Sequence, residues 1–224
     1  MRRADELSTK RDLLRAFLAE GSPRVIVCAL LGAVVLRLAI GGWSWVDGAI
    51  AVGTFAAVGI VERLVHLHLL HAPEDSWARR VLGAGRGHEK HHLDPPDIEW
   101  LLLQRQDAFV HTLFIAVVSA LWVVPAMLVL GVFLGGVGLL GPWATAVLCA
   151  VAALAHFEST HQLERSSYRP TSCFYRRLVR NHRLHHHRNE HYWLGVTSNL
   201  GDRVMGTYVD RSAVPKSETA RSLT

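Results

Sequence analysis

Asn181-His182-Arg183-Leu184-His185-His186-His187 is a run in which four of seven residues are histidine. It places histidines at positions i, i+3 and i+4, and the same spacing occurs in His88-Glu89-Lys90-His91-His92. On an α-helix these positions share one face, so three imidazoles can converge on one point. Imidazole is a good ligand for iron, zinc, copper and nickel. Two such triplets, each following an apolar segment that itself ends in histidine, predict a metal site.

The composition indicates a membrane protein. The chain has 224 residues, enough for one domain or one membrane bundle, and half of them are hydrophobic. The apolar residues occur in long runs instead of being spread along the chain. The three cysteines have no paired or metal-type spacing, so we expect them to be reduced. The 14 histidines are many for a chain of this length and need an explanation.

Four apolar segments are long enough to cross a bilayer, which takes about 20 residues. We therefore predict an all-α integral membrane protein with four transmembrane helices and a cytoplasmic, helical, histidine-rich cap. Arg37 lies near the end of the first segment, where its side chain can reach the interface. Gly135-Gly136-Val137-Gly138 predicts a hairpin between the last two segments. The predicted spans are residues 24–40, 47–70, 108–132 and 142–163.

The distribution of charge supports this topology. Four spans place both termini and the loop over residues 72–107 on one side of the membrane. All Lys and Arg residues outside the spans lie on that side, and the two short turns on the other side have none. The positive-inside rule then predicts that both termini and the histidines are cytoplasmic. The net charge of +5 therefore reflects topology, and we expect no nucleic-acid partner.

We predict three segments: residues 1–23, a membrane domain over residues 24–210, and a polar tail over residues 211–224. The first segment is basic, and its Leu and Phe spacing predicts a short amphipathic helix. This helix lies either on the membrane surface or in solvent. The apolar run begins too late for a signal peptide.

Nine histidines are the expected ligands. They exceed the four to six positions that one ion usually offers, so we expect two ions. An all-nitrogen site of this kind suits iron working with O2, and zinc can substitute. His156 is a further candidate, but it precedes His161 by five residues and would need a distorted turn, as would the pair His66 and His71. The nine are His66, His71, His88, His91, His92, His161, His182, His185 and His186.

The order of these motifs resembles the fatty acid hydroxylase/sterol desaturase superfamily. The resemblance covers about residues 55–208 and is closest to bacterial fatty acid 2-hydroxylase-like members. It rests on Glu62-Arg63-Leu64-Val65-His66 with His71, on Phe157-Glu158-Ser159-Thr160-His161 with Tyr168-Arg169-Pro170, on Asn181 to His186, on Gly195-Val196-Thr197-Ser198 and on Asp202-Arg203-Val204-Met205-Gly206-Thr207.

The resemblance implies a membrane-bound, non-haem di-iron oxygenase that hydroxylates or desaturates a lipid C–H bond, most simply on a fatty acyl chain. It implies two iron ions, O2 and electrons from a cytoplasmic carrier of the ferredoxin or cytochrome type. The catalytic residues would be the metal ligands alone. Alternatives are a sterol or carotenoid hydroxylase or desaturase, and a non-catalytic metal-binding membrane protein. Glu62, Glu158 and Asp202 would orient the imidazoles or simply satisfy polar groups.

Two positions depart from the family pattern. Arg165 stands where members usually have a histidine four residues after His161, and a guanidinium cannot bind a metal. Arg165 is instead a candidate anchor for a lipid phosphate. Gly201 directly precedes Asp202, at a position where family members often have an aromatic residue.

Overall fold

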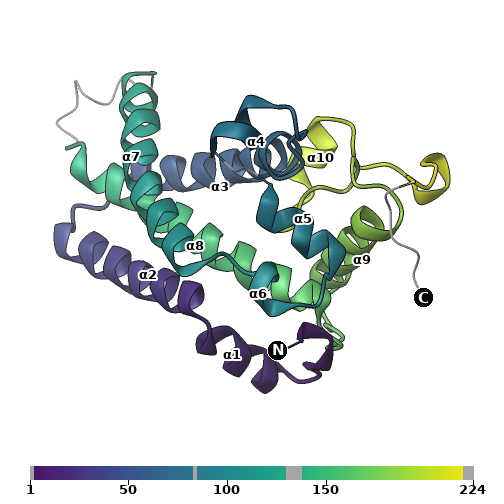
Figure 1. The fold of residues 1–224 in the computed structure, drawn as a ribbon. Coiled ribbons are helices and arrows are strands. Elements are labelled where there is room, and N and C mark those ends of the chain that lie inside the picture. The colour runs from purple at the N-terminus through teal and green to yellow at the C-terminus, as the bar shows by residue number, and fades with distance from the viewer. Residues whose placement is uncertain (1–2, 83–84, 130–137, 219–224) are drawn as a thin grey trace. The chain divides into compact units, whose positions relative to one another are not determined.

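The structure, a computed structural model, describes residues 3–82, 85–129 and 138–218. Most of these residues are helical, and no β-strand occurs among them (Figure 1). The chain is therefore the predicted all-α integral membrane protein. Residues 135–137 of the expected hairpin and the end of the third predicted span lie outside the described residues. The helices long and apolar enough to cross a membrane are Gly21–Ile40, Trp45–Leu70, His111–Val129 and Leu140–Arg165.

The described residues form two compact units, and helices α3 and α8 contribute to both. One unit, here the histidine unit, is built from Met1–Phe17, Gly59–Leu102 and Phe157–Thr224. The other, here the span unit, is built from Leu18–Val58 and Leu103–His156.

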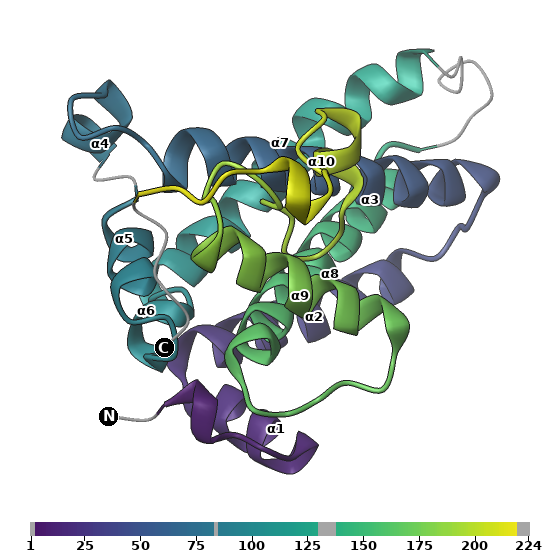
Figure 2. The same cartoon turned by 90° about the vertical axis from the view of Figure 1, so that its right-hand side faces the viewer.

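The histidine unit consists of short helices and helix ends, among them α5, α6 and α9 (Figure 2). In its N-terminal helix, Phe17 is buried and packs with Ile98 and Leu101, whereas Leu14 is exposed. Its elements are η1 (Ala4–Glu6), most of α1 (Lys10–Ala19), the end of α3 (Trp45–Val65), η2 (His66–Leu70), α4 (Trp77–Leu82), α5 (Arg86–Leu93), α6 (Ile98–Leu101), the end of α8 (Leu140–Arg165), α9 (Cys173–His187), α10 (Leu200–Val204) and η4 (Arg211–Ala213).

Gly201 at the start of α10 lies against the end of α3. A Cβ added to Gly201 would meet the Gly59 carbonyl oxygen at 2.5 Å and the Arg63 Cβ at 2.7 Å. No side chain fits there without moving the backbone. This close approach gives a physical reason for glycine where an aromatic residue was expected.

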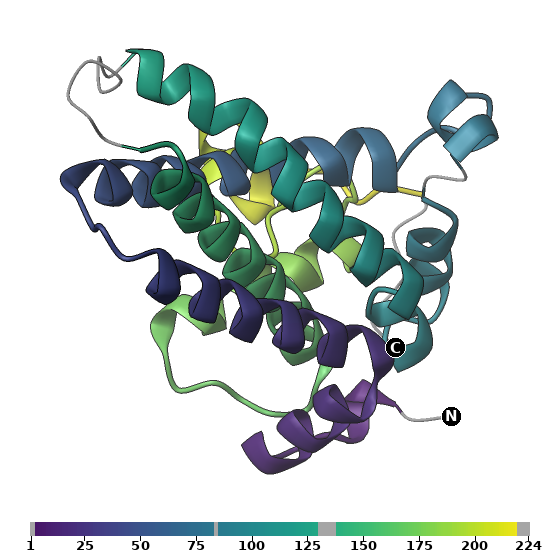
Figure 3. The ribbon, with the colours of Figure 1, turned by 90° about the vertical axis from the view of Figure 1, so that its left-hand side faces the viewer.

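The span unit contains α2 (Gly21–Ile40), α7 (Arg105–Val129) and the first parts of α3 and α8. Helices α2 and α7 pack side by side (Figure 3). Ile50, Val123 and Met127 are buried where α3 and α7 meet. Large apolar side chains such as Val52 and Leu121 are exposed, which is expected of helices that face lipid.

Arg37 does not reach out to an interface as the sequence suggested. Its side chain is buried, and its Nη2 atom donates to Asp47 Oδ1 at 2.8 Å. Its Nε atom donates to Thr145 Oγ1 at 2.7 Å, and Thr145 donates to the same carboxylate at 2.6 Å. The expectation was wrong because Asp47 and Thr145 supply a buried partner for the charge.

Candidate metal centre

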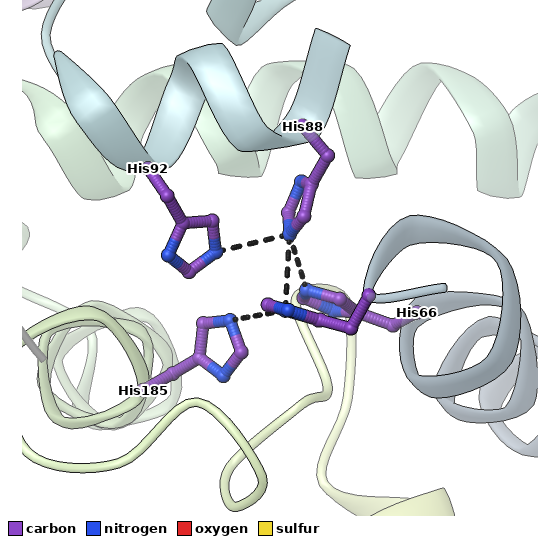
Figure 4. A group of neighbouring side chains, drawn as sticks. His66, His88, His92 and His185 are labelled. Atoms are coloured by element: carbon purple, nitrogen blue, oxygen red, sulfur yellow. Dashed lines mark hydrogen bonds between the residues drawn. The ribbon is translucent and has the colours of Figure 1, made fainter. Parts of the chain in front are cut away.

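The structure gathers eight of the nine expected ligands into two groups. In each group one ligand atom per residue lies within 4.8 Å of all the others. Figure 4 shows four members of the first histidine group pointing toward one another. The first histidine group is His66, His71, His88, His92 and His185, and the second histidine group is His91, His161 and His182.

Each histidine triplet serves both groups. On α5, His88 and His92 belong to the first group, whereas His91 belongs to the second. On α9, His185 belongs to the first group and His182 to the second. The spacing i, i+3 and i+4 therefore spreads the rings over two adjacent sites instead of aiming all three at one. The His91 and His92 ring centroids are 5.9 Å apart, so the two groups are neighbours.

A π-helical turn brings His66 and His71 together. Residues His66–Leu70 form η2, and the His71 amide donates to the His66 carbonyl oxygen at 3.1 Å. Residues five apart lie about 140° apart on a regular α-helix, but the wider π turn returns the chain to the same face. The two rings stack with centroids 5.2 Å apart and an interplanar angle of 13°. The distorted turn predicted from the sequence is present.

Backbone carbonyls fix the tautomers of two ligands. His66 Nδ1 lies 2.6 Å from the Leu194 carbonyl oxygen, and His185 Nδ1 lies 3.1 Å from that of Tyr192. A carbonyl only accepts, so each Nδ1 carries the proton. Each Nε2 therefore keeps its lone pair and directs it into the first histidine group.

The loop that carries these carbonyls is held by two carboxylates, those of the buried Asp202 and the half-buried Glu62. Asp202 accepts from the amides of Leu194 and Gly195 at 3.1 and 2.8 Å. Glu62 accepts from the amides of Val196 and Thr197 and from the Thr197 hydroxyl. Of the two roles considered for these carboxylates, orienting imidazoles or satisfying polar groups, the contacts combine both: Glu62 and Asp202 accept from amides of the loop, and the Leu194 carbonyl of that loop accepts from His66.

Trp193, next to Leu194, has a φ of 52°, a left-handed conformation that costs a bulky residue energy. Its side chain is buried, and its indole Nε1 atom donates to the Val209 carbonyl oxygen at 3.1 Å. These contacts hold the strained residue in place. The strain lies directly beside the carbonyl that orients His66.

The ring nitrogens of the first group suit a metal ion better than a set of hydrogen bonds. His88 Nε2 lies 3.0–3.2 Å from the Nε2 atoms of His92, His66 and His71. One nitrogen has a single proton or a single lone pair, so it cannot form three hydrogen bonds. Two imidazoles bound to one ion at about 2.1 Å would have nitrogens about 3.0 to 3.4 Å apart. The donor set therefore fits a metal.

Burial keeps these imidazoles neutral, the form that binds metal. It lowers the pKa of His71 to about 4 and that of His92 to about 2. Burial also lowers the pKa of His88 and His185 well below the ordinary value, and the neighbouring imidazoles add to the effect. Protons therefore do not compete for these nitrogens near neutral pH.

Within the described part of the chain the second group has three members, and His186 and His156 are in neither group. The His186 ring nevertheless stacks on that of His92 with centroids 3.9 Å apart, so it lies beside the site. His156 lies on α8, which is a regular α-helix between it and His161 and has no π turn there. Glu158 is buried one turn before His161 on the same helix.

Glu164 is a further residue beside the histidines that was not predicted from the sequence. Its side chain is buried, and its Oε2 atom lies 3.5 Å from Nδ1 of His182. Glu164 follows His161 by three residues, so helical spacing alone places both on one face. That spacing was the available signal.

Arg165 lies close to the second group. The side chain is buried, and its charge adds to burial in lowering the pKa of His182 and His186. A permanent cation therefore stands near the site where the resemblance leads us to expect a fourth imidazole.

A cavity of about 460 Å3 opens onto the first group. His71, His88 and His92 line it together with residues of the loop after η2 and Glu190. It gives small molecules a route to the histidines.

In a comparison with protein families, residues 51–207 match the model described as fatty acid hydroxylase. This match covers more than half of the chain and includes both histidine groups. The chain belongs to the fatty acid hydroxylase family. No curated protein and no solved structure matches it. Membership of the fatty acid hydroxylase family implies an oxidoreductase at a membrane, and the paired histidine groups fit the metal binding that this role requires.

Proposed function

We propose that this protein is a di-iron oxygenase that hydroxylates, or desaturates, a C–H bond of a lipid, with a fatty acyl chain as the substrate. The observation that carries this proposal is the adjacency of two histidine groups that share helices α5 and α9. Bound iron would supply the activation of O2. Hydroxylation would consume O2, two electrons and two protons, and would give an alcohol and water.

In this proposal the chain's own residues hold and orient the reaction centre. The first and second histidine groups would each hold one ion, with zinc as a possible substitute in purified protein. The carbonyls of Leu194 and Tyr192 keep the Nε2 lone pairs directed inward. The electrons would come from a cytoplasmic ferredoxin or cytochrome, and the histidine unit would face the cytoplasm with both termini.

The test combines metal analysis with lipid analysis. Full-length protein purified in detergent and reconstituted with iron is expected to hold two ions per chain. Cells that express the protein should accumulate a hydroxylated or desaturated lipid absent from cells expressing His88→Ala, and the lipid class would separate acyl chains from sterols and carotenoids. Fewer than one ion per chain, or identical lipid profiles, would contradict the proposal.

A second candidate is a metal-binding membrane protein without turnover. The buried Arg165 beside the three-membered second histidine group favours it, because this cation replaces an expected ligand. Arg165→His tests it: a gain in lipid product would show that a ligand had been lost. Metal binding without product in both forms would favour the second candidate.

A further inference from the structure

The histidine unit contains a large basic pocket that the proposed chemistry does not use. The cavity has a volume of about 910 Å3 and is lined by the end of α8, one face of α9 and the C-terminal segment. Among the described residues, seven arginines and one lysine line it, against a single carboxylate, that of Asp5. Such an excess of positive charge favours an anionic ligand.

Helix α9 has different chemistry on its two faces. Its buried face carries His182, His185 and His186. Arg176, Arg180 and Arg183 line the basic pocket and are exposed, and their spacing of four and then three residues places them along one stripe of the helix. The basic pocket and the two histidine groups are therefore built on the same short helix.

Arg165 gives the basic pocket a buried donor. Its side chain is 8% exposed, and its Nε and Nη2 atoms have no hydrogen-bond partner among the described residues. Leaving buried donors without acceptors is unfavourable, more so for a charged group. Arg183 also lies close enough for the two like charges to repel. An anion between them would satisfy the donors and relieve the repulsion.

The neighbouring carboxylate of Glu164 does not supply acceptors for the Arg165 donors. Its charge attracts Arg165, but within the described chain neither of its carboxylate oxygens accepts a hydrogen bond. Its Oε2 atom lies 3.5 Å from His182 Nδ1, beside the second histidine group. Asp5, which also lines the basic pocket, is already paired with Arg3 at 3.4 Å.

We propose that the basic pocket binds a phosphate group, held by the buried guanidinium of Arg165 and the exposed guanidinium of Arg183. The planar guanidinium matches the oxygens of a phosphate with two parallel hydrogen bonds. An acidic protein surface would meet the exposed arginines of α9 but leave the buried Arg165 unsatisfied, so a small group that enters the pocket fits better. Phosphate could come from solution or from a lipid headgroup.

The first arm of the test is a calorimetric titration of inorganic phosphate into the full-length, metal-loaded protein in detergent at constant ionic strength. We expect one phosphate per chain. Arg165→Gln and Arg183→Gln should each weaken binding at least tenfold. Arg177→Gln is the matched control, because Arg177 is also exposed on α9 but does not line the basic pocket. It should change binding less than twofold.

The second arm identifies the source of the phosphate. Native mass spectrometry compares retention of dioctanoyl phosphatidic acid with that of dioctanoylglycerol, which has the same chains and no phosphate. Preferential retention of phosphatidic acid that Arg183→Gln abolishes assigns a lipid headgroup, whereas binding of inorganic phosphate alone assigns free phosphate.

Three results would overturn the proposal: neither probe binds, both variants bind like the unsubstituted protein, or only an acidic protein binds. Metal content and thermal unfolding of each variant report folding. If Arg165→Gln fails to fold, phosphate binding by Arg183→Gln still tests the proposal, because Arg183 is exposed. Because binding is measured directly, the result does not depend on lipid turnover.

Discussion

In the first histidine group, the direction of the lone pair of His66 and of His185 depends in each case on one neighbouring carbonyl oxygen. The carbonyl oxygen of Leu194 holds the proton on His66 Nδ1, and that of Tyr192 does the same for His185. Both are backbone carbonyls, so no side chain in the sequence indicates that they bind the imidazoles. The spacing of the histidines predicted which rings would be used, but the acceptors that fix their tautomers became visible only in the folded chain.

Replacing His185 should empty the first histidine group with little effect on folding elsewhere. Its Nε2 atom lies 3.3 Å from that of His71, so His185→Ala removes one of five inward-facing donors. We expect iron content per chain to fall by at least half, measured by inductively coupled plasma mass spectrometry. His191→Ala is the control, because His191 is exposed and lies in neither group. Equal loss in both variants would contradict the assignment.

Asp202→Ala tests whether the loop is needed to orient the ligands. The substitution leaves the buried amides of Leu194 and Gly195 without their acceptor, at about 1–3 kcal/mol each. Loss of such supporting contacts typically weakens metal binding about 10–100-fold. Competition with a chelator of known affinity measures the change. An unchanged affinity with a lowered unfolding temperature would limit Asp202 to a structural role.

At the scale of elements, the π turn η2 determines how the end of α3 presents its histidines. The i, i+5 spacing of His66 and His71 predicted a distortion, because a regular helix would point the rings apart. The sequence could not show what packs against the turn. That neighbour is Gly85, whose added Cβ would lie 2.4 Å from the Leu70 carbonyl oxygen.

Gly85→Ala should therefore disturb the first histidine group from outside it. Gly85 has a φ of 78° and Gly206 a φ of 73°, so alanine at either position brings roughly 1–2 kcal/mol of backbone strain. Only Gly85 adds a clash, because nothing lies within 4 Å of a Cβ at Gly206. We expect Gly85→Ala to lower both the unfolding temperature and the iron content. Gly206→Ala should lower the temperature less and leave the iron content unchanged.

For the histidine triplets of α5 and α9, residue spacing predicts the shared helix face but not the site to which each ring belongs. Helical geometry correctly places His88, His91 and His92 near one face. It does not decide how the three divide between two sites, because that depends on which helix packs on either side. The contact of Glu164 with His182 was missed for the same reason, since it joins α8 to α9.

At the scale of the whole molecule, hydropathy was a sufficient guide to the four spans. Each predicted span has a corresponding long helix, and those ends that fall within the described residues differ from the predicted ones by a few residues. Hydropathy did not reveal the buried charge inside the span unit. Arg37 was expected to reach an interface because its partners, Asp47 and Thr145, are 10 and 108 residues away in the sequence.

Arg37→Ala should destabilise the span unit strongly. It removes one partner of a buried ion pair and leaves the Asp47 carboxylate uncompensated, which typically costs about 3–5 kcal/mol. Thermal unfolding in detergent should show a clear decrease in the midpoint. Arg24→Ala on the same helix is the comparison, since Arg24 is exposed. A midpoint equal to that of Arg24→Ala would show that the pair contributes little.

The division of each triplet between two sites has a consequence for how the protein acquires its ions. Because α5 and α9 each serve both sites, an ion that settles in one of them restrains the rotation of both helices about their axes. The second ion then meets rings that are already ordered, and its uptake loses less conformational freedom. Loading should accordingly be cooperative, with half-filled protein scarce at every stage of a titration.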